Sequence, residues 1–372
     1  MKLLFCGDMA FTKSTGKSTI ISNEMQKLMS QYDLVCVNFE AAMEDKTYKP
    51  SKIGPSIIMD DLMCNAIKNC KFDLFCLANN HIMDQGFGGL NRIKRTFAEI
   101  DMIGADENSE LAYAPFIWEN SGSTVGILNI AENGFGACIS DDVGGYAWFK
   151  KNCIREKILS LKKKCDVLII VVHAGAENWD FPLPEIREMY RQYVDWGVDI
   201  VIGHHPHTPQ GWERYKESWI YYSLGNFAFY EGENVKNHAH SVCASVEVVN
   251  GNITCSPVYT VFENNVVNIC RDTEFIIHMD RCNEVLHNES EYIKEVNNQV
   301  LNEYENLVKE YYCQVNGMYL KKTPVNYVKS FIKRHLWKRS FDNRWLYHNL
   351  MIETHLWVAR RALMLKMCDD EV

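Results

Sequence analysis

Short apolar runs, each followed directly by polar residues, dominate the first half of this chain. Runs that stay apolar on both faces are typical of strands buried in a parallel sheet. Segments with helical character separate the runs, so the pattern predicts alternating strands and helices. The predicted strands are residues 3–6, 34–37, 74–77, 167–172 and 199–202, and the predicted helices are residues 23–30, 60–69, 88–100 and 183–196. In such α/β folds, ligands bind at the carboxyl ends of the strands.

The pattern changes beyond the last of these runs. Residues 219–224, 242–249 and 253–261 are predicted strands, and Asn250-Gly251 between the last two predicts a hairpin. Farther on the chain turns helical, with candidate helices at residues 289–312 and 325–365. We therefore predict an α/β domain over residues 1–270 and a helical C-terminal extension over residues 271–372.

The overall charge argues against nonspecific nucleic-acid binding, because the formal net charge is −9 and nucleic-acid-binding domains are basic. The C-terminal extension differs from the rest: residues 321–366 hold eleven Lys and Arg residues and two acidic residues, interleaved with Trp. Such a segment could lie on an anionic membrane surface or contact a synthase partner. The alternative is a solvated helical appendage that packs on the catalytic domain.

We expect a cytoplasmic protein that can associate peripherally with the inner face of the membrane. No window approaches the roughly 20 apolar residues of a membrane helix, and the first predicted strand leaves no room for a signal peptide before it. The fourteen cysteines include no Cys-x-x-Cys pair, and Cys6, Cys36 and Cys76 lie inside apolar runs. That usage indicates reduced, structural thiols.

Carboxylates and asparagines follow the first three predicted strands. In chain order they are Asp8, then Asn38 and Glu40, then Asn79-Asn80-His81 with Asp84 just beyond. A carboxylate can bridge two divalent ions about 3.5 to 4 Å apart, and an Asn carbonyl is a hard neutral ligand. The histidine beside that Asn can reach past a metal to donate a proton. The alternative is structural: Asp8 and the asparagines would cap helices.

Histidines follow the other two strands. His204, His205 and His207 lie together at the end of the strand over residues 199–202. Pro206 stiffens the loop, and strand alternation would point His205 and His207 the same way and His204 away. We therefore expect His204 to support the ligands or the fold and not to bind metal itself. His173 ends the strand over residues 167–172, where a lone His is usually a core residue, but Glu177 follows it closely. We therefore predict metal ligands at these strand ends.

Six motifs stand in a fixed order along the chain. They are Gly7-Asp8; Asn38-Phe39-Glu40; residues 78–81 with Asp84 and Gly86; residues 173–177; residues 203–210; and residues 222–227. This order resembles the calcineurin-like metallophosphoesterases, and still more closely the CapA-type poly-γ-glutamate capsule biosynthesis family. The C-terminal extension lies outside the resemblance.

The resemblance implies a four-layer α/β/β/α sandwich whose strand ends hold two divalent ions, either Mn, Fe or Zn. One ion would be held by Asp8 and His207, the other by Asn80, His173 and His205, and Glu40 would bridge them. His81, with Asp84, would act as general acid. Asn38, Asn79, Glu177 and Asn226 would contact the substrate.

The predicted function is a metal-dependent hydrolase. It would act on a phosphoester or amide of an anionic small molecule or envelope polymer during capsule or poly-γ-glutamate biosynthesis. One position departs from the catalytic phosphoesterases, which usually carry Asp-x-His at the first strand, because this chain has Asp8-Met9-Ala10. The alternative function is a non-catalytic metal- or polymer-binding subunit of a capsule synthase complex.

Overall fold

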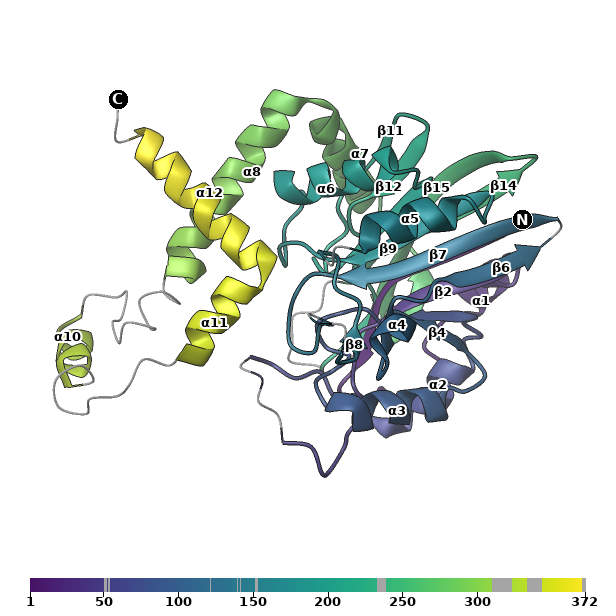
Figure 1. The fold of residues 1–372 in the computed structure, drawn as a ribbon, viewed down its shortest axis with the longest axis horizontal. Coiled ribbons are helices and arrows are strands. Elements are labelled where there is room, and N and C mark those ends of the chain that lie inside the picture. Colours follow the sequence, from purple (N-terminus) through teal and green to yellow (C-terminus); the bar gives the residue numbers. More distant parts are fainter. Residues whose placement is uncertain are drawn as a thin grey trace. The chain divides into compact units, whose positions relative to one another are not determined.

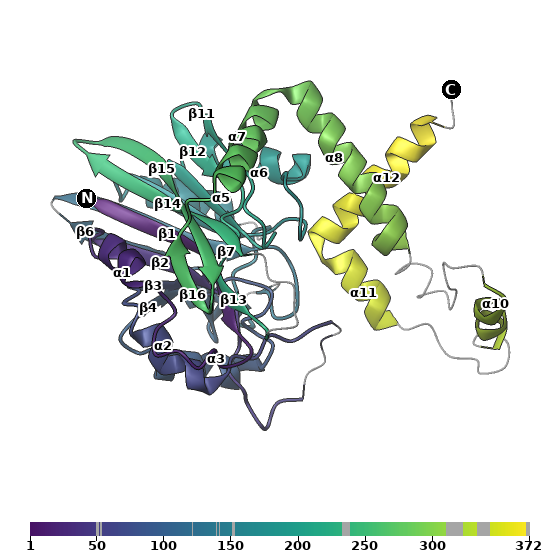
Figure 2. The same cartoon turned by 180° about the vertical axis from the view of Figure 1, so that it is seen from behind.

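The computed structural model of the chain forms two compact units, Met1–Asn288 and Glu289–Val372. It describes residues 1–49, 52, 54–120, 122–138, 140, 142–150, 153–232, 239–309, 323–332 and 343–369. The first unit is built on two β-sheets, and the second is helical (Figures 1 and 2).

The larger sheet contains the three predicted N-terminal strands. Its order is β16-β15-β14-β1-β2-β3-β4, and β13 also pairs with β1. The bounds are β1 (Lys2–Phe11), β2 (Leu34–Phe39), β3 (Leu74–Cys76), β4 (Asp101–Ile103), β13 (Asn226–Tyr230), β14 (His240–Val249), β15 (Asn252–Glu263) and β16 (Val266–Ile269). The start of β1 pairs antiparallel with β14, and its end, from Asp8, pairs parallel with β13. This change of partner places Asp8 inside the sheet and not at its rim.

The smaller sheet has the order β11-β12-β10-β9-β7-β6. Its strands are β6 (Phe116–Asn120), β7 (Ser123–Ala131), β9 (Val167–His173), β10 (Ile200–His204), β11 (Trp212–Tyr215) and β12 (Ser218–Tyr221), and a separate pair joins β5 (Ala105–Asp106) to β8 (Gly145–Tyr146). β7, β9 and β10 run parallel, as the apolar runs predicted for β9 and β10. β7 was not predicted, because Gly126 and Asn129 interrupt its apolar pattern.

The helices of the first unit lie between or beside these strands. They are α1 (Asn23–Met29), η1 (Asp61–Met63), α2 (Cys64–Lys68), α3 (Gly86–Thr96), α4 (Ser109–Ala112), α5 (Ile154–Lys162), α6 (Pro184–Asp195) and α7 (Thr273–His287). Pro184 begins α6, a position where the missing N–H costs nothing. α5 contacts β9, and α6 contacts β10 and β12.

The two faces of the larger sheet pack against different elements, and each face contributes to its own hydrophobic cluster. Leu4, Cys6 and Val35 pack with buried residues of α1, α2 and α3. Their neighbours Leu3 and Phe5 pack with the apolar residues of β7, β9 and β10 from the smaller sheet. Since strand side chains alternate between faces, helices cover one side of this sheet and the second sheet covers the other. With α5 and α6 on the smaller sheet, the predicted four-layer α/β/β/α sandwich is confirmed.

The second unit consists of α8 (Glu289–Glu303), the π turn η2 (Tyr304–Val308), α10 (Pro324–Phe331), α11 (Asn343–Met351) and α12 (Glu353–Asp369). α12 contacts α8, η2 and α11. The compact units divide after Asn288, so α7, which our predicted boundary at residue 270 assigned to the extension, belongs to the first unit. Within the described ranges, no helix has both the length and the apolar character needed to cross a membrane.

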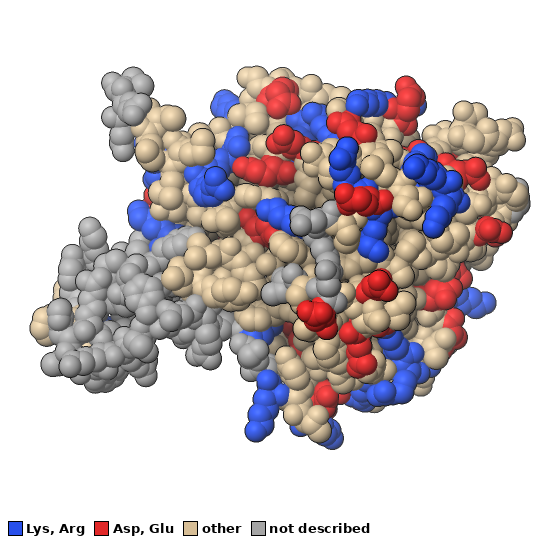
Figure 3. Space-filling model, in the orientation of Figure 1, with Lys and Arg blue, Asp and Glu red and all other residues tan. Residues whose placement is uncertain are grey.

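Acidic and basic side chains are interspersed over the face of the molecule drawn in Figure 3. Exposed ion pairs of the first unit include Arg214 with Glu217 and Arg92 with Asp61. Exposed pairs of this kind contribute little to stability. The buried charges are therefore the better candidates for function.

Candidate metal centre

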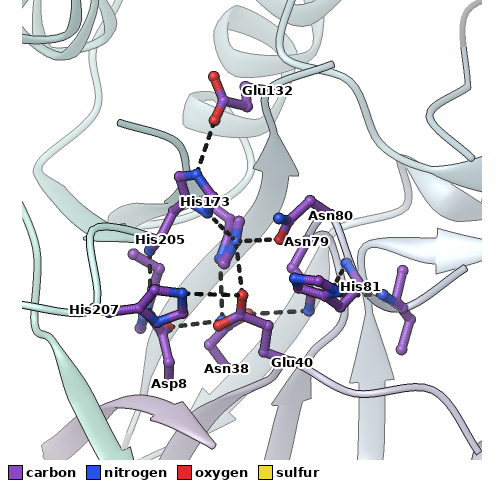
Figure 4. Close-up of polar contacts among 12 residues, drawn as sticks. Asp8, Asn38, Glu40, Asn79, Asn80, His81, Glu132, His173, His205 and His207 are labelled. Carbon is purple, nitrogen blue, oxygen red and sulfur yellow. Dashed lines mark hydrogen bonds and ion pairs between the residues drawn. The ribbon is translucent and has the colours of Figure 1, made fainter. Parts of the chain in front are cut away.

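The strand ends of both sheets converge on one buried cluster of polar residues (Figure 4). β1 and β2 are parallel and place Asp8 opposite Asn38, and β9 and β10 are parallel and place His173 opposite His204. Because the strands of each pair are parallel, their carboxyl ends lie at the same edge of their sheet, as expected from the sequence. Contacts of His204 with Asp8 and of His173 with Asn38 then join the two edges.

Two groups of potential metal ligands share one carboxylate. Glu40, His173 and His205 form the first group, and Asp8, Glu40 and His207 form the second. Within each group the candidate ligand atoms all lie within 4.8 Å of one another. Glu40 therefore belongs to both groups, and its role as a bridge between two ions stays a prediction.

The first group is built around the Nε2 atom of His173. This atom lies 2.9 Å from Asn80 Oδ1, 3.0 Å from His205 Nδ1 and 3.5 Å from Glu40 Oε1. On the other side of the ring, Asn38 Nδ2 lies 3.1 Å from His173 Nδ1. Three potential ligand atoms, including the predicted Asn80 Oδ1, thus lie within 3.5 Å of His173 Nε2.

The second group is built around Asp8. Asp8 Oδ1 accepts hydrogen bonds from Asn38 Nδ2 at 2.8 Å and from His204 Nδ1 at 2.7 Å, and Asp8 Oδ2 accepts the backbone N–H of His205 at 3.3 Å. His207 Nδ1 lies 3.8 Å from Asp8 Oδ2. His204 therefore does not point away from the cluster, as strand alternation had suggested, but holds the Asp8 carboxylate.

Asn226 fixes the ring of His207. Its Oδ1 atom lies 2.9 Å from His207 Nδ1, and because an amide oxygen only accepts, Nδ1 carries the proton. The Nε2 atom of His207 is then left with its lone pair, 4.0 Å from Glu40 Oε1. In the structure the carbonyl of Asn226 orients a candidate ligand, and its predicted contact with substrate stays a prediction.

The state of Glu40 tests whether divalent ions suit this cluster. Both carboxylate oxygens are buried and have no hydrogen-bond partner among the described residues. Burial, together with the nearby negative charges of Asp8 and Glu177, raises the pKa of Glu40 well above its ordinary value. An unpaired buried carboxylate is costly, whereas one that bridges two cations is stabilised. The residues present therefore fit a pair of divalent ions.

The histidines of the first group are held in the form that binds metals. Burial lowers the pKa of His173 well below its ordinary value, and neighbouring imidazoles lower it further. Burial also lowers the pKa of His205, to about 4. Both rings are neutral at pH 7, and neutral imidazole is the ligand form. Burial alone would raise the pKa of Asp8, but His204 and His207 lower it, so this carboxylate stays ionised.

His81 lies beside the cluster and is paired with Asp84. His81 Nδ1 is 2.7 Å from Asp84 Oδ2, which also accepts the backbone N–H of Ile57 at 2.8 Å. Lys52 forms a salt bridge with the other oxygen of Asp84, and its Nζ atom lies 3.2 Å from both His81 Nδ1 and the carbonyl of Asn80. Burial lowers the pKa of His81, although Asp84 opposes this.

The four residues predicted to contact substrate have different surroundings in the structure. Asn79 is fully buried, donates to the carbonyl of Phe39 and accepts the N–H groups of His81 and Ile82, so its amide serves the fold. Asn38 holds Asp8 and His173, and Asn226 holds His207. Glu177 is exposed near the cluster and interacts electrostatically with Glu40 and His205.

Sequence reasoning missed two charged residues of the site, Glu132 and Lys52. Glu132 Oε1 lies 3.2 Å from His205 Nε2. It directly follows β7, so recognising that strand would have placed it at the same sheet edge as His173. Lys52 lies in a loop between β2 and η1 whose sequence carries no periodicity, and nothing local in the sequence indicates its contact with Asp84.

Comparison with known proteins gave matches over the first unit. The family description "Bacterial capsule synthesis protein PGA_cap" matches residues 2–231. The chain is 31% identical over 215 residues to the capsule biosynthesis protein CapA of Bacillus anthracis, which covers 54% of this chain and 51% of that protein. It is 28% identical over 229 residues to the PGA biosynthesis protein CapA of Bacillus subtilis (strain 168), which covers 59% of each. The chain thus spans little more than half the length of these curated relatives.

A solved structure of the calcineurin-like phosphoesterase YfkN from Bacillus subtilis is also similar, with a TM-score of 0.44 at 12% identity. The alignment covers 79% of this chain and 98% of that structure.

Proposed function

This chain belongs to the bacterial capsule synthesis protein (PGA_cap) family, and on that premise we propose that it is a metal-dependent hydrolase of capsule or poly-γ-glutamate biosynthesis. The family predicted from the six motifs is thereby confirmed. One observation carries the proposal of metal-dependent chemistry: the Glu40 carboxylate is buried, has no hydrogen-bond partner in the described part of the chain, and belongs to both candidate ligand groups.

In this proposal each ion has its own histidines. Asp8 and His207 would hold one ion, Asn80, His173 and His205 would hold the other, and Glu40 would bridge them. When bound, the ions would act as Lewis acids that activate a water molecule and stabilise negative charge on the reacting group. The substrate would be anionic, either a small phosphoester or an amide or ester of an envelope polymer.

His81 would supply the proton for the leaving group. Its Nδ1 atom is engaged with Asp84 at 2.7 Å, so Nε2 is the atom that would carry and release the proton. Asp84 raises the pKa of His81, but burial and the ammonium group of Lys52 lower it and prevail, and Lys52 also forms a salt bridge with Asp84. Asp84 would thus be a positioning residue for the general acid.

The test combines metal analysis with a substrate screen. We expect purified protein to contain Mn, Fe or Zn, or to bind one when offered, and to hydrolyse a generic phosphodiester or a γ-glutamyl peptide. His173→Ala should lose activity and should lose or weaken the ion assigned to Asn80, His173 and His205. The matched control is His240→Ala, since His240 is partly exposed and pairs with Asp272. Protein that binds no metal, or activity that survives His173→Ala, would contradict the proposal.

A second candidate function is a non-catalytic, metal- or polymer-binding subunit of a synthase complex. The observation in its favour is Ala10, which is 2% exposed and packs in the core beside the helices. The group of Asp8, Glu40 and His207 therefore gains no imidazole from β1. Metal binding without turnover in the same screen would favour this function over the hydrolase.

We also propose that the C-terminal extension contacts anionic lipid at the inner membrane face. On α10, Val325, Val328 and Phe331 are each more than half exposed, and their spacing places them on one side of the helix. Lys329 lies beside them. Residues 321–322 and 333–342 of the predicted basic segment lie outside the described residues.

Vesicle flotation of the full chain tests this contact. We expect binding to vesicles that contain phosphatidylglycerol, weaker binding at high salt, and loss of binding in the double variant Val328→Asp/Phe331→Asp. Val249→Asp is the control, because Val249 is an equally exposed valine in the β14–β15 hairpin of the first unit. Equal flotation of all three proteins would contradict the proposal.

A further inference from the structure

Glu132 touches both histidines of the first candidate ligand group. It follows Ala131, the last residue of β7, which pairs with His173 in β9. The backbone N–H of Glu132 donates to the carbonyl of His173 at 3.0 Å, and Tyr146 Oη donates to the carbonyl of Glu132 at 3.2 Å. The main chain of Glu132 is therefore fixed on both sides, and its side chain leaves from a rigid strand end.

The carboxylate of Glu132 reaches the far side of the other imidazole. Glu132 Oε1 lies 3.2 Å from His205 Nε2, and Glu132 is only 2% exposed (Figure 4). An ionised carboxylate only accepts hydrogen bonds, so the proton of the neutral His205 ring is on Nε2. The lone pair is then on Nδ1, which lies 3.0 Å from His173 Nε2.

The alternative tautomer would be unsuitable for a cation. With the proton on Nδ1, His205 would direct an N–H dipole toward Glu40 and His173, where an ion needs a lone pair. Its Nε2 lone pair would also face the Glu132 carboxylate at 3.2 Å, which is repulsive. The geometry therefore selects one tautomer before any ion arrives.

We propose that Glu132 is a positioning residue, which holds His205 in the Nε2-protonated tautomer and thereby presents its Nδ1 atom as a ligand. The metal part of this inference rests on the proposed function, whereas the tautomer can be measured without metal. Such outer partners of ligating histidines typically change metal affinity by about 10- to 100-fold.

The direct test is ¹⁵N NMR of the histidine side chains in metal-free protein. We expect His205 to be protonated at Nε2 in the wild type, and Glu132→Ala to shift the ring toward a mixture of tautomers. Titration calorimetry with Zn²⁺ and with Mn²⁺ alone should show affinity about 10- to 100-fold weaker in Glu132→Ala. Glu132→Asp should recover part of the loss, because it restores a carboxylate on a shorter side chain.

Glu213→Gln is the matched control for loss of a buried carboxylate. Glu213 is 5% exposed and pairs with Arg187 and Arg191, away from the ligand groups. This variant should leave the His205 tautomer and the metal affinity unchanged, even though its stability falls. Circular dichroism confirms that each variant is folded before titration.

The outcomes separate the two proposals. Wild-type protein that binds no metal, but whose His205 tautomer depends on Glu132, would overturn the proposed function and support the positioning role. A wild-type His205 protonated at Nδ1, or a Glu132→Ala protein with an unchanged tautomer and unchanged affinity, would overturn the role of Glu132.

Discussion

His173 and His205 face each other with the Nε2 atom of one 3.0 Å from the Nδ1 atom of the other, and both rings are buried. The far nitrogen of each ring has its own partner, Asn38 for His173 and Glu132 for His205. Each ring is therefore fixed through its outer nitrogen, and the inner nitrogens, His173 Nε2 and His205 Nδ1, face each other. Asn38 Nδ2 can only donate to His173 Nδ1, so in the metal-free protein the His173 proton is on Nε2, facing Asn80 Oδ1 and His205 Nδ1. A cation bound by His173 Nε2 would replace this proton, with Glu40 Oε1 3.5 Å from the same nitrogen.

The two ligand groups should fill with different affinities. One ion would have Glu40 with Asn80, His173 and His205, and the other only Glu40 with Asp8 and His207. We expect titration calorimetry to resolve a tighter and a weaker step. His207→Ala should reduce bound metal from two to about one ion per chain, measured by elemental analysis after gel filtration. Two ions of equal affinity, or two ions retained by His207→Ala, would contradict this assignment.

Glu40→Gln should change stability in opposite directions with and without metal. In the metal-free protein, the variant removes a buried charge with unpaired oxygens, and we expect the free energy of unfolding at pH 7 to rise by about 1 to 3 kcal/mol. With saturating Zn²⁺ or Mn²⁺, only the wild type gains the full stabilisation from binding. Urea unfolding of both proteins in both conditions measures the difference. A variant that is less stable without metal would show that Glu40 is satisfied by the chain itself.

The sequence predicted the sheet edge and most of the residues gathered there, because strands of a parallel sheet are marked by strong apolar runs. It placed Glu40, Asn80 and His173 correctly at or just beyond the ends of those strands, whereas Asp8 lies within β1, which continues to Phe11. β7 was missed, because Gly126 and Asn129 break its apolar pattern, and Glu132 was missed with it. The contact of Glu132 with His205 depends on how β7 and β10, which are far apart in the sequence, are placed in the sheet.

His205 and His207 join the cluster for a reason other than the predicted one. β10 ends at His204, so alternation along a strand does not apply beyond it. His205 has φ 97° and His207 has φ 60°, in the left-handed region that such residues rarely adopt. Strained backbone of this kind is concentrated at functional sites, but no local sequence pattern predicts it. Pro206 between them gives only rigidity.

Gly7→Ala should disturb the site through the backbone. A Cβ at Gly7 would lie 2.0 Å from the carbonyl oxygen of Gly225, the oxygen that accepts the N–H of Asp8 at 2.9 Å. We expect a loss of about 1 to 3 kcal/mol in the free energy of unfolding and weaker metal binding, because Asp8 must move. Urea unfolding and calorimetry measure the two effects.

The matched control for that variant is Gly126→Ala. There the added Cβ meets only side-chain atoms of Cys165 and Leu161, at 3.1 Å, and side chains can yield more easily than the backbone. Gly126→Ala should keep wild-type metal affinity. If Gly7→Ala also keeps it, the position of Asp8 does not depend on the close approach of β1 and Gly225.

Glu213→Gln should lower stability in a pH-dependent way. Burial alone would raise the pKa of Glu213, but Arg191, Arg187 and Tyr222 lower it from 4.5 to about 2. As the pH falls, the unfolded chain takes up the proton first, so the contribution of Glu213 is complete above pH 4.5 and is lost between pH 4.5 and 2. We expect a deficit of about 2 kcal/mol at pH 7 that shrinks below pH 4.5, measured by urea unfolding. The control is Glu217→Gln, at an exposed pair with Arg214, which should show no deficit at pH 7 or below pH 4.5. A deficit for Glu213→Gln that stays constant down to pH 3 would mean that the lost stability reflects packing and not charge.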